Sequence, residues 1–139
     1  MTSDIGAYVF VCSAGTELEC YRRQLLGTNA SGEVVLGIRP GDKLFLYNYA
    51  RKTLRGPLQA TSGGGRDIVL EAWGGSFPFQ VRFAVPTEGL REVGKKAIEP
   101  FILFASAGMP YVAISVQARE QLLGLLRTSG KQADVPKGA

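Results

Sequence analysis

The sequence predicts a single α+β domain with a curled, mainly antiparallel β-sheet. Short β-prone runs outnumber helical segments, and the links between them are too short for the helical crossovers of a parallel sheet. Only two segments have clear helical periodicity, one after the first predicted strand and one near the C-terminus. We expect one domain over residues 1–129 and a polar, disordered tail over residues 130–139.

The first predicted strand leads almost directly into the first helix. Residues 7–12 (AYVFVC) combine β-branched and aromatic side chains, which favour a strand. Thr16 and Glu19 stand three positions apart, as in a capping box, where each side chain bonds a free backbone N–H of the first helical turn. We therefore expect a helix that starts after Thr16 and ends at Gly27, since glycine readily adopts the left-handed conformation that ends helices.

The middle of the chain predicts a central strand and a hairpin. Residues 39–42 (RPGD) fit a type II turn, and residues 43–49 (KLFLYNY) are apolar on both faces, which indicates a strand with neighbours on both sides. A short turn then leads into a strand over residues 54–61. Pro57 interrupts that strand and predicts a bulge or an unpaired edge, because proline cannot donate a ladder hydrogen bond.

The second half of the sequence predicts three more strands and a helix. Residues 77–83 (FPFQVRF) alternate, so we expect a half-buried strand with Gln80 and Arg82 on the solvent face. Residues 101–105 and 111–114 predict two further strands. The last helix follows Ser115 as its N-cap and has four apolar residues on one face: Ala118, Leu122, Leu125 and Leu126.

The residue inventory argues against an enzyme and against a metal site. The chain has no histidine, which excludes Ser-His-Asp and Cys-His catalysis. Two cysteines without histidine are too few for a zinc site, which takes about four such ligands. For Cys12 and Cys20 we favour reduced thiols that pack as small apolar side chains, with a Cys12–Cys20 disulfide as the alternative.

One segment comes close to a phosphate-binding loop. Residues 89–96 (GLREVGKK) lack the Ser or Thr that would follow the lysine and hold magnesium, and Pro100 would end the required helix early. We therefore expect a non-enzymatic binding module without cofactor or metal.

Charge and hydropathy narrow the range of partners. A net charge of +4 suits a polyanion such as RNA, but a basic surface that only maintains solubility has the same balance. No apolar run approaches the roughly 18–20 residues needed to cross a bilayer, and no secretory signal is visible at the start. We expect a cytoplasmic protein with no membrane partner.

Several motifs together resemble the plant-type DCD (development and cell death) domain. The resemblance rests on FVC at residues 10–12, IRPGDKLFLYNY at 38–49, the single Trp73, FPFQVR at 77–82 and QLL at 121–123. It extends from about Gly6 to Leu126, nearly the whole chain. More loosely, the pattern is similar to the EVE and YTH domains of the PUA-like superfamily, which implies a PUA-like curled barrel with a helix after the first strand and a C-terminal helix.

The resemblance implies a ligand pocket at the mouth of the barrel. In the related domains this pocket takes a modified base, often between aromatic residues. Thr28 and Asn29 stand where YTH domains carry a tryptophan, and Trp73 either stacks on a ligand or plugs one end of the barrel. Carried over by position, the pocket residues are Ser13, Thr28, Asn29, Tyr47, Asn48 and Trp73.

Two functions follow from this reading. In the first, the domain binds RNA or a single nucleotide: Trp73 and Tyr47 stack on the base, and Ser13 and Asn48 hydrogen-bond its edge. Six basic residues would meet phosphates: Arg22, Arg23, Arg51, Lys52, Arg55 and Arg66. In the second, the domain binds a protein partner in stress or cell-death signalling through an exposed apolar patch.

Overall fold

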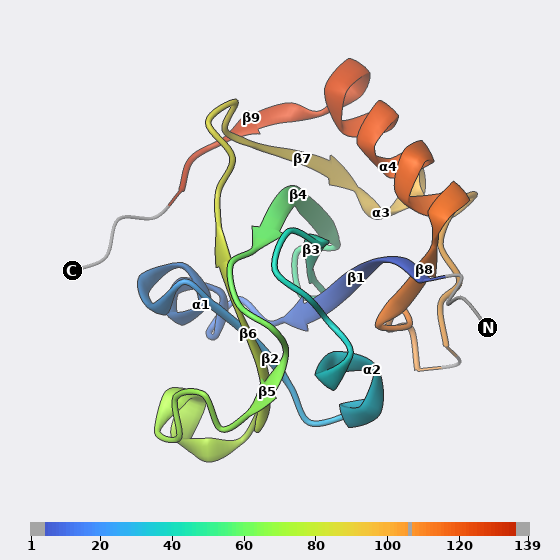
Figure 1. Ribbon diagram of the computed structural model, residues 1–139. Coiled ribbons are helices and arrows are strands. Elements are labelled where there is room, and N and C mark those ends of the chain that lie inside the picture. Colours follow the sequence, from blue (N-terminus) through green and yellow to red (C-terminus); the bar gives the residue numbers. More distant parts are fainter. Residues whose placement is uncertain (1–4, 106, 136–139) are drawn as a thin grey trace.

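A computed structural model describes residues 5–105 and 107–135, and a curled β-sheet organises them (Figure 1). The strands are β1 (Ile5–Cys12), β2 (Leu25–Thr28), β3 (Lys43–Asn48), β4 (Thr53–Ala60), β5 (Gly65–Arg66), β6 (Phe79–Ala84), β7 (Leu90–Gly94), β8 (Ala113–Ser115) and β9 (Lys131–Ala133). The helices are α1 (Glu17–Arg23), α2 (Gly32–Leu36), the 3-10 helix η1 (Ala72–Gly75), α3 (Lys95–Ile98) and α4 (Val116–Ser129).

The strand order is β2-β6-β4-β3-β1-β8, with β5 paired to β6 and β7 lying between β4 and β9. Among the described residues every strand pair is antiparallel except β1 with β3. The predicted α+β fold with a curled, mainly antiparallel sheet is therefore confirmed. The β1–β3 pair is parallel because α1, β2 and α2 lie between the two strands and return the chain to the same end.

The predicted central strand is β3, which pairs with β1 on one side and with β4 on the other. Residues 44–48 are all buried, as expected for a strand that is covered on both faces. The register between β3 and β4 shifts between Leu44 and Leu46, opposite Pro57, so the predicted irregularity is present. Beyond it β4 changes neighbour: residues 53–56 pair with β7 and residues 59–60 pair with β6, and this change curls the sheet.

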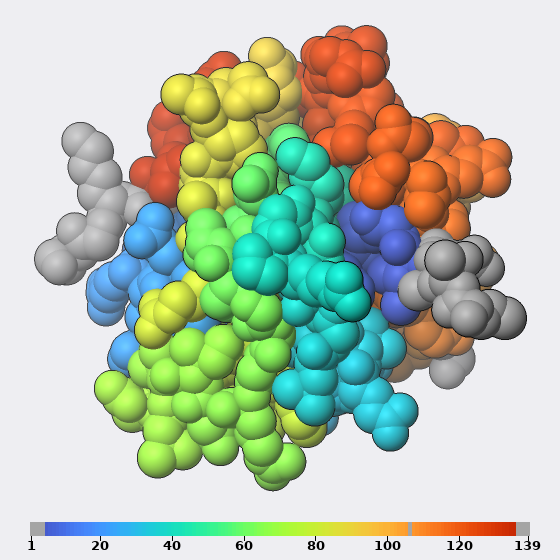
Figure 2. All heavy atoms as spheres, in the orientation of Figure 1, coloured from blue at the N-terminus to red at the C-terminus, as the bar shows by residue number. Residues whose placement is uncertain are grey.

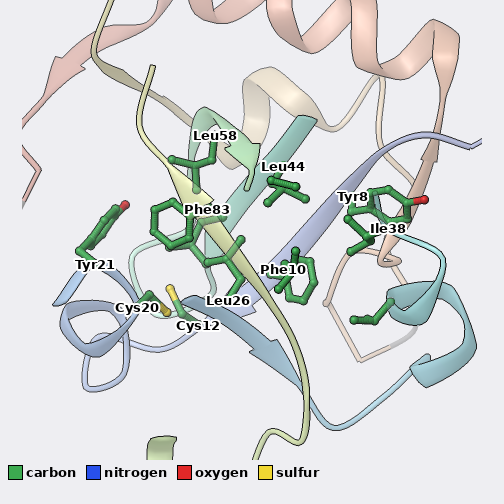
Figure 3. Packing of buried hydrophobic residues seen from close by; sticks show 14 of the residues in the cluster. Tyr8, Phe10, Cys12, Cys20, Tyr21, Leu26, Ile38, Leu44, Leu58 and Phe83 are labelled. Atoms are coloured by element: carbon green, nitrogen blue, oxygen red, sulfur yellow. The ribbon is translucent and has the colours of Figure 1, made fainter. Parts of the chain in front are cut away.

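Each face of the sheet carries its own hydrophobic core. Alternate side chains of β1 and β3 divide between the two faces: Phe10 and Leu46 lie in one core, and Val9 and Phe45 in the other. The first core also contains both cysteines and residues of β6 (Figure 3). The second core is closed by α4, which lies at the upper right in Figure 1.

The first helix differs from its prediction at both ends. Thr16 makes no capping hydrogen bond to the helix; its Oγ1 accepts instead from the backbone N–H of Ser13, at 2.9 Å. The helix ends at Gln24, which takes the left-handed conformation at φ 50°. Gly27 lies further on, inside β2, where a tertiary contact described below requires glycine.

The predicted strand at residues 101–105 is wrong. The backbone N–H groups of Phe101 and Ile102 donate to the carbonyl of Ile98, at 2.9 and 3.0 Å, and so continue the turns of α3. Between residues 101 and 112 only a single bridge, Phe104 to Pro110, forms among the described residues, and the strand predicted at 111–114 is formed at Ala113–Ser115.

The C-terminal part is helical as predicted, but the chain after it is more ordered than expected. The Ser115 hydroxyl caps α4 by accepting from the N–H of Ala118, at 3.0 Å, which confirms the predicted N-cap. The disordered tail predicted from residue 130 contains β9, whose backbone pairs with β7 at residues 131–133. Residues 136–139 lie outside the described part.

Candidate functional site

A pocket of about 510 Å³ opens where β1 and β3 end. Its walls come from residues 11–13 and 16, residues 27–31, Tyr49, Phe77, Ala105 and residues 109–112. We call this cavity the neutral pocket, because none of these lining residues carries a charge. Its volume lies within the range of about 300–1,000 Å³ that is usual for small-molecule sites.

Aromatic rings and unpaired amide and hydroxyl groups border the neutral pocket. Tyr49 and Tyr111 are exposed at its rim, and Phe77 is half-buried in its wall. In the described part of the chain, the Asn29 amide and the two tyrosine hydroxyls have no protein hydrogen-bond partner. A planar ligand in this pocket could therefore stack on aromatic rings and form hydrogen bonds with polar side chains.

The structure brings three of the six predicted pocket residues together: Ser13, Thr28 and Asn29 line the neutral pocket. Two of their hydroxyls already have partners. The Ser13 hydroxyl lies 3.1 Å from that of Thr16, and the Thr28 hydroxyl accepts from the N–H of Ala30 at 3.1 Å. Only the Asn29 amide is left fully available.

Tyr47 and Asn48 do not line the pocket. Tyr47 is 1% exposed and packs edge-on against Phe104, with ring centroids 5.7 Å apart. The Asn48 amide donates to Glu17 at 2.8 Å, and its oxygen accepts from the N–H groups of Ala50 and Arg51. Both side chains face the interior because β3 is covered on both sides, so alternation along the strand does not expose either face.

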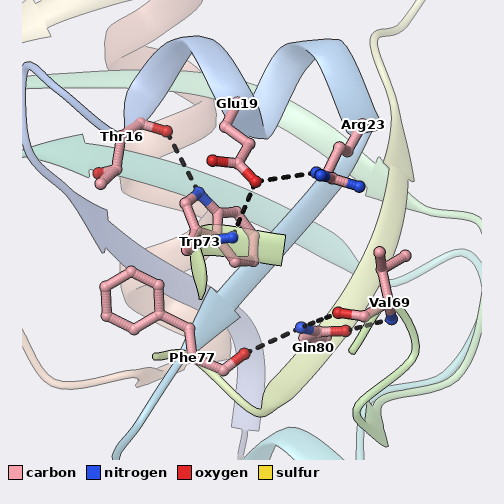
Figure 4. Close-up of polar contacts among 7 residues, drawn as sticks. All are labelled: Thr16, Glu19, Arg23, Val69, Trp73, Phe77 and Gln80. Atoms are coloured by element: carbon pink, nitrogen blue, oxygen red, sulfur yellow. Dashed lines mark hydrogen bonds and ion pairs between the residues drawn. The ribbon is translucent and has the colours of Figure 1, made fainter. Parts of the chain in front are cut away.

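Trp73 does not line the neutral pocket; it packs between α1 and Phe77, which is a lining residue (Figure 4). Its backbone N–H donates to the Glu19 carboxylate at 2.8 Å, its indole N–H reaches the Thr16 carbonyl at 3.4 Å, and its ring packs edge-on against Phe77. A Cβ at Gly27 would come within 2.6 Å of the indole, so only glycine fits there. Trp73 therefore supports Phe77 and β2 from behind, and Glu19 also binds Arg23, at 2.8 Å.

Gln80 holds the other end of the same loop. The alternation of residues 77–83 predicted a solvent-facing Gln80, but its side chain is 1% exposed. Its amide oxygen accepts from the N–H of Val69 at 2.7 Å, and its amide nitrogen donates to the carbonyls of Val69 and Phe77 (Figure 4). The segment of residues 69–77 folds back over this face of β6, and this arrangement has no signal in the local sequence.

The six predicted phosphate contacts are spread over the surface and do not surround one site. Arg23 pairs with Glu19, and Arg66 lies over the Phe79 ring at 5.4 Å. Arg55 is largely buried between two carboxylates and is committed to the interior. Three remain exposed without an ion pair among the described residues: Arg22 on α1, and Arg51 and Lys52 in the turn that directly follows Tyr49.

Both cysteines are free and buried, and their sulfur atoms lie in the same part of the first core (Figure 3). Burial is the main cause that raises the pKa of both thiols, to about 12 for Cys20, and the nearby Glu17 carboxylate adds to it. Each thiol therefore stays protonated in the folded protein at neutral pH.

We expect the free energy of unfolding to fall as the pH rises above about 8.5, where thiols of the unfolded chain ionise but those of the folded chain do not. The contribution of the two thiols to stability is fully present below that pH and is lost as the pH rises toward the pKa of the folded state. Urea unfolding between pH 8 and 10 measures the slope, which approaches about 1.4 kcal/mol per pH unit for each thiol. The double variant Cys12→Ala/Cys20→Ala should lose this slope; equal slopes in both proteins would contradict the assignment.

The fold and the pocket define a class of small α+β domain, in which a curled sheet opens at one end into an uncharged cavity. The chain belongs to the development and cell death domain family, which it matches over residues 6–100. This confirms the predicted family. The described residues contain no helix long and apolar enough to cross a membrane, and no cluster of three or more metal-ligating side chains.

Three plant proteins illustrate the family. The chain is 40% identical over 98 residues to the DCD domain-containing protein NRP-B of Glycine max, covering 69% of this chain and 29% of that protein. Identity is 43% to the B2 protein of Daucus carota and 44% to the NRP protein of Arabidopsis thaliana, each over 86 residues and 56% of this chain. These matches cover 42% and 25% of the two relatives, so the curated relatives are considerably longer than the shared domain.

Solved YTH domains have the same fold. The YTH domain of the Zygosaccharomyces rouxii MRB1 protein, in complex with N6-methyladenosine RNA, matches with a TM-score of 0.55, 16% identity and 92% coverage of both chains. The Pho92 YTH domain, in complex with m6A, matches with a TM-score of 0.56 and 13% identity, covering 93% of this chain and 88% of that one. At this identity the likeness establishes the fold alone, and it confirms the predicted YTH-like architecture.

Proposed function

We propose that this domain binds single-stranded RNA by holding one nucleobase in the neutral pocket. The observation that carries the proposal is the uncharged cavity with Tyr49 and Tyr111 exposed at its rim. A nucleobase is flat and uncharged, so it gains from ring stacking and needs no counter-ion. The YTH domains that share the fold were solved with N6-methyladenosine, which supports a base as the ligand.

In this proposal, different side chains at the neutral pocket contact the base and the phosphates of the RNA. Tyr49 and Tyr111 stack against the base, and the Asn29 amide offers both a donor and an acceptor to its edge. The exposed Arg51 and Lys52 follow Tyr49 after one alanine, and in this proposal they contact the flanking phosphates. Trp73, behind the wall, keeps Phe77 in position and does not touch the base.

Fluorescence anisotropy with labelled oligoribonucleotides, with and without one N6-methyladenosine, tests the proposal. We expect Tyr49→Ala to weaken binding about tenfold, since base stacking contributes about 1–3 kcal/mol. Asn29→Ala should alter the preference among bases. Gln117→Ala, an exposed amide on α4, is the control and should bind as the wild type does.

Salt titration separates the phosphate contacts from the base contacts. Replacing Arg51 and Lys52 by glutamine should reduce the slope of log K against log salt by about one per lost contact and leave base preference unchanged. No RNA binding at about 50 mM salt would refute the proposal. If Tyr49→Ala and Asn29→Ala both left RNA binding unchanged, the RNA site would lie outside the neutral pocket.

A further inference from the structure

A second cavity, of about 350 Å³, lies at the other end of β3 from the neutral pocket. We call it the basic recess; Lys43, Pro57, Glu88, Arg91, Leu123 and Arg127 are among its lining residues. Lys43 is the first residue of β3, whereas the neutral pocket borders Tyr49 beyond its last residue. In Figure 2 three segments that contribute to the recess lie in the upper part of the face shown: the start of β3 in teal, residues 86–91 in yellow and α4 in orange.

Three cationic side chains border the basic recess, and the protein leaves most of their donors unused. Lys43 and Arg127 form no ion pair or side-chain hydrogen bond in the part of the chain that the structure describes. Arg91 donates from Nη1 to the carbonyl of Gly130 at 3.0 Å, which orients its guanidinium while its other N–H groups stay available. Unpaired cations that share one cavity attract an anion.

One carboxylate stands at the rim of the recess. Glu88 lies in a tight turn, closed by a hydrogen bond from the Gly89 N–H to the Pro86 carbonyl at 2.9 Å, with Gly89 at φ 95°. It makes no ion pair within 4 Å with the three cations among the described residues, so the lining keeps a net charge of about +2. An exposed carboxylate beside an anion site can accept hydrogen bonds from hydroxyl groups of the ligand.

The remaining walls are apolar. Pro57 of β4 and Leu123 of α4 present carbon surface between the charged groups, and Pro86 adds to it from the turn. The cavity volume is at the lower end of the range for small-molecule sites, which favours a compact ligand over a length of polymer.

We propose that the basic recess binds a small phosphate monoester with a hydroxylated carbon body. The phosphate dianion has three terminal oxygens, and the three cationic side chains can each donate to them. The carbon body then lies on Pro57 and Leu123, and its hydroxyl groups donate to Glu88. This site is independent of the RNA proposal, since the two cavities share no lining residue.

Titration of the full chain with glucose 6-phosphate, followed by two-dimensional NMR, tests this proposal. We expect saturable shifts at Gly89 and Arg91, with inorganic phosphate binding more weakly and glucose not binding. The double variant Lys43→Gln/Arg127→Gln should bind at least about tenfold more weakly. Arg22→Gln/Lys96→Gln removes the same charge from exposed positions outside the recess and should bind as the wild type does.

Four results would overturn the proposal. Glucose 6-phosphate could fail to saturate any site on the folded wild type, or both double variants could weaken binding equally. Sulfate, phosphate and glucose 6-phosphate could also bind with equal affinity, which would show general attraction of anions without a specific site. A further arm compares RNA with and without a 5′-phosphate: if the 5′-phosphate alone occupies the recess, the small-molecule class is wrong.

Discussion

Replacing Arg55 by methionine is expected to lower the free energy of unfolding by about 3–5 kcal/mol, a large part of the stability of a domain this size. Arg55 contacts Glu92 at 2.7 Å and Glu17 at 3.3 Å, and the side chains of Arg55 and Glu17 are only 13% and 11% exposed. Without the guanidinium, the Glu17 carboxylate stays buried, and the hydrogen bonds left to it among the described residues come from Asn48 and Tyr21. An uncompensated buried charge is among the most destabilising changes available.

Urea unfolding, monitored by circular dichroism, measures this loss. Arg66→Met is the matched control, because Arg66 is 68% exposed and lies 4.0 Å from Asp67; it should change stability by less than about 1 kcal/mol. Combining Arg55→Met with Glu17→Gln should cost clearly less than the sum of the two single changes, since each removes the same interaction. Additive effects, or a loss below about 1 kcal/mol for Arg55→Met, would show that the pair does not carry this part of the fold.

Replacing Gly27 by alanine is expected to destabilise the domain by about 2 kcal/mol and to displace the pocket wall. The added Cβ would lie 2.6 Å from the indole of Trp73 and 3.0 Å from the Cβ of Phe77. Either β2 or the Trp73 loop must move, and with it Phe77 in the wall of the neutral pocket. Since the sequence has a single tryptophan, a shift of its fluorescence emission reports the movement directly.

Gly15→Ala is the control for this change. Gly15 lies between β1 and α1, and a Cβ there would come no closer than 3.9 Å to its nearest neighbour, the Ser13 hydroxyl. We expect its stability and tryptophan emission to remain those of the wild type. If Gly27→Ala behaved in the same way, the close packing of Trp73 on β2 would not exist in solution.

The elements that were predicted correctly are those whose signal lies within one short segment. The apolar run predicted at residues 43–49 forms the central strand β3 over Lys43–Asn48, and Ser115 caps the last helix through its own third neighbour, Ala118. The errors arose where a side chain that a local pattern assigned to a near neighbour instead bonds a residue far away in the sequence. Glu19 looked like half of a capping box, but its carboxylate binds Trp73, which is 54 positions away.

The site divides in the same way. Ser13, Thr28 and Asn29 were carried over by position from the family resemblance, and the structure places them at the pocket because they lie at or directly after the ends of β1 and β2. Tyr49 and Tyr111 were missed, although an aromatic residue directly after the central strand was a signal that could have identified Tyr49. Tyr111 belongs to a loop whose path depends on α3 and the Phe104–Pro110 bridge.

The sequence alone determined the family, the α+β class and the central strand, because these depend on residue type and near-neighbour spacing. Only the tertiary structure decided which polar groups form internal hydrogen bonds and which remain available to a ligand. The Asn48 amide is hydrogen-bonded to Glu17, 31 positions away, and the Gln80 amide is hydrogen-bonded to the backbone of Val69 and Phe77. A buried polar group must find a partner wherever the fold supplies one, and that partner's distance along the chain is set by packing rather than by local pattern.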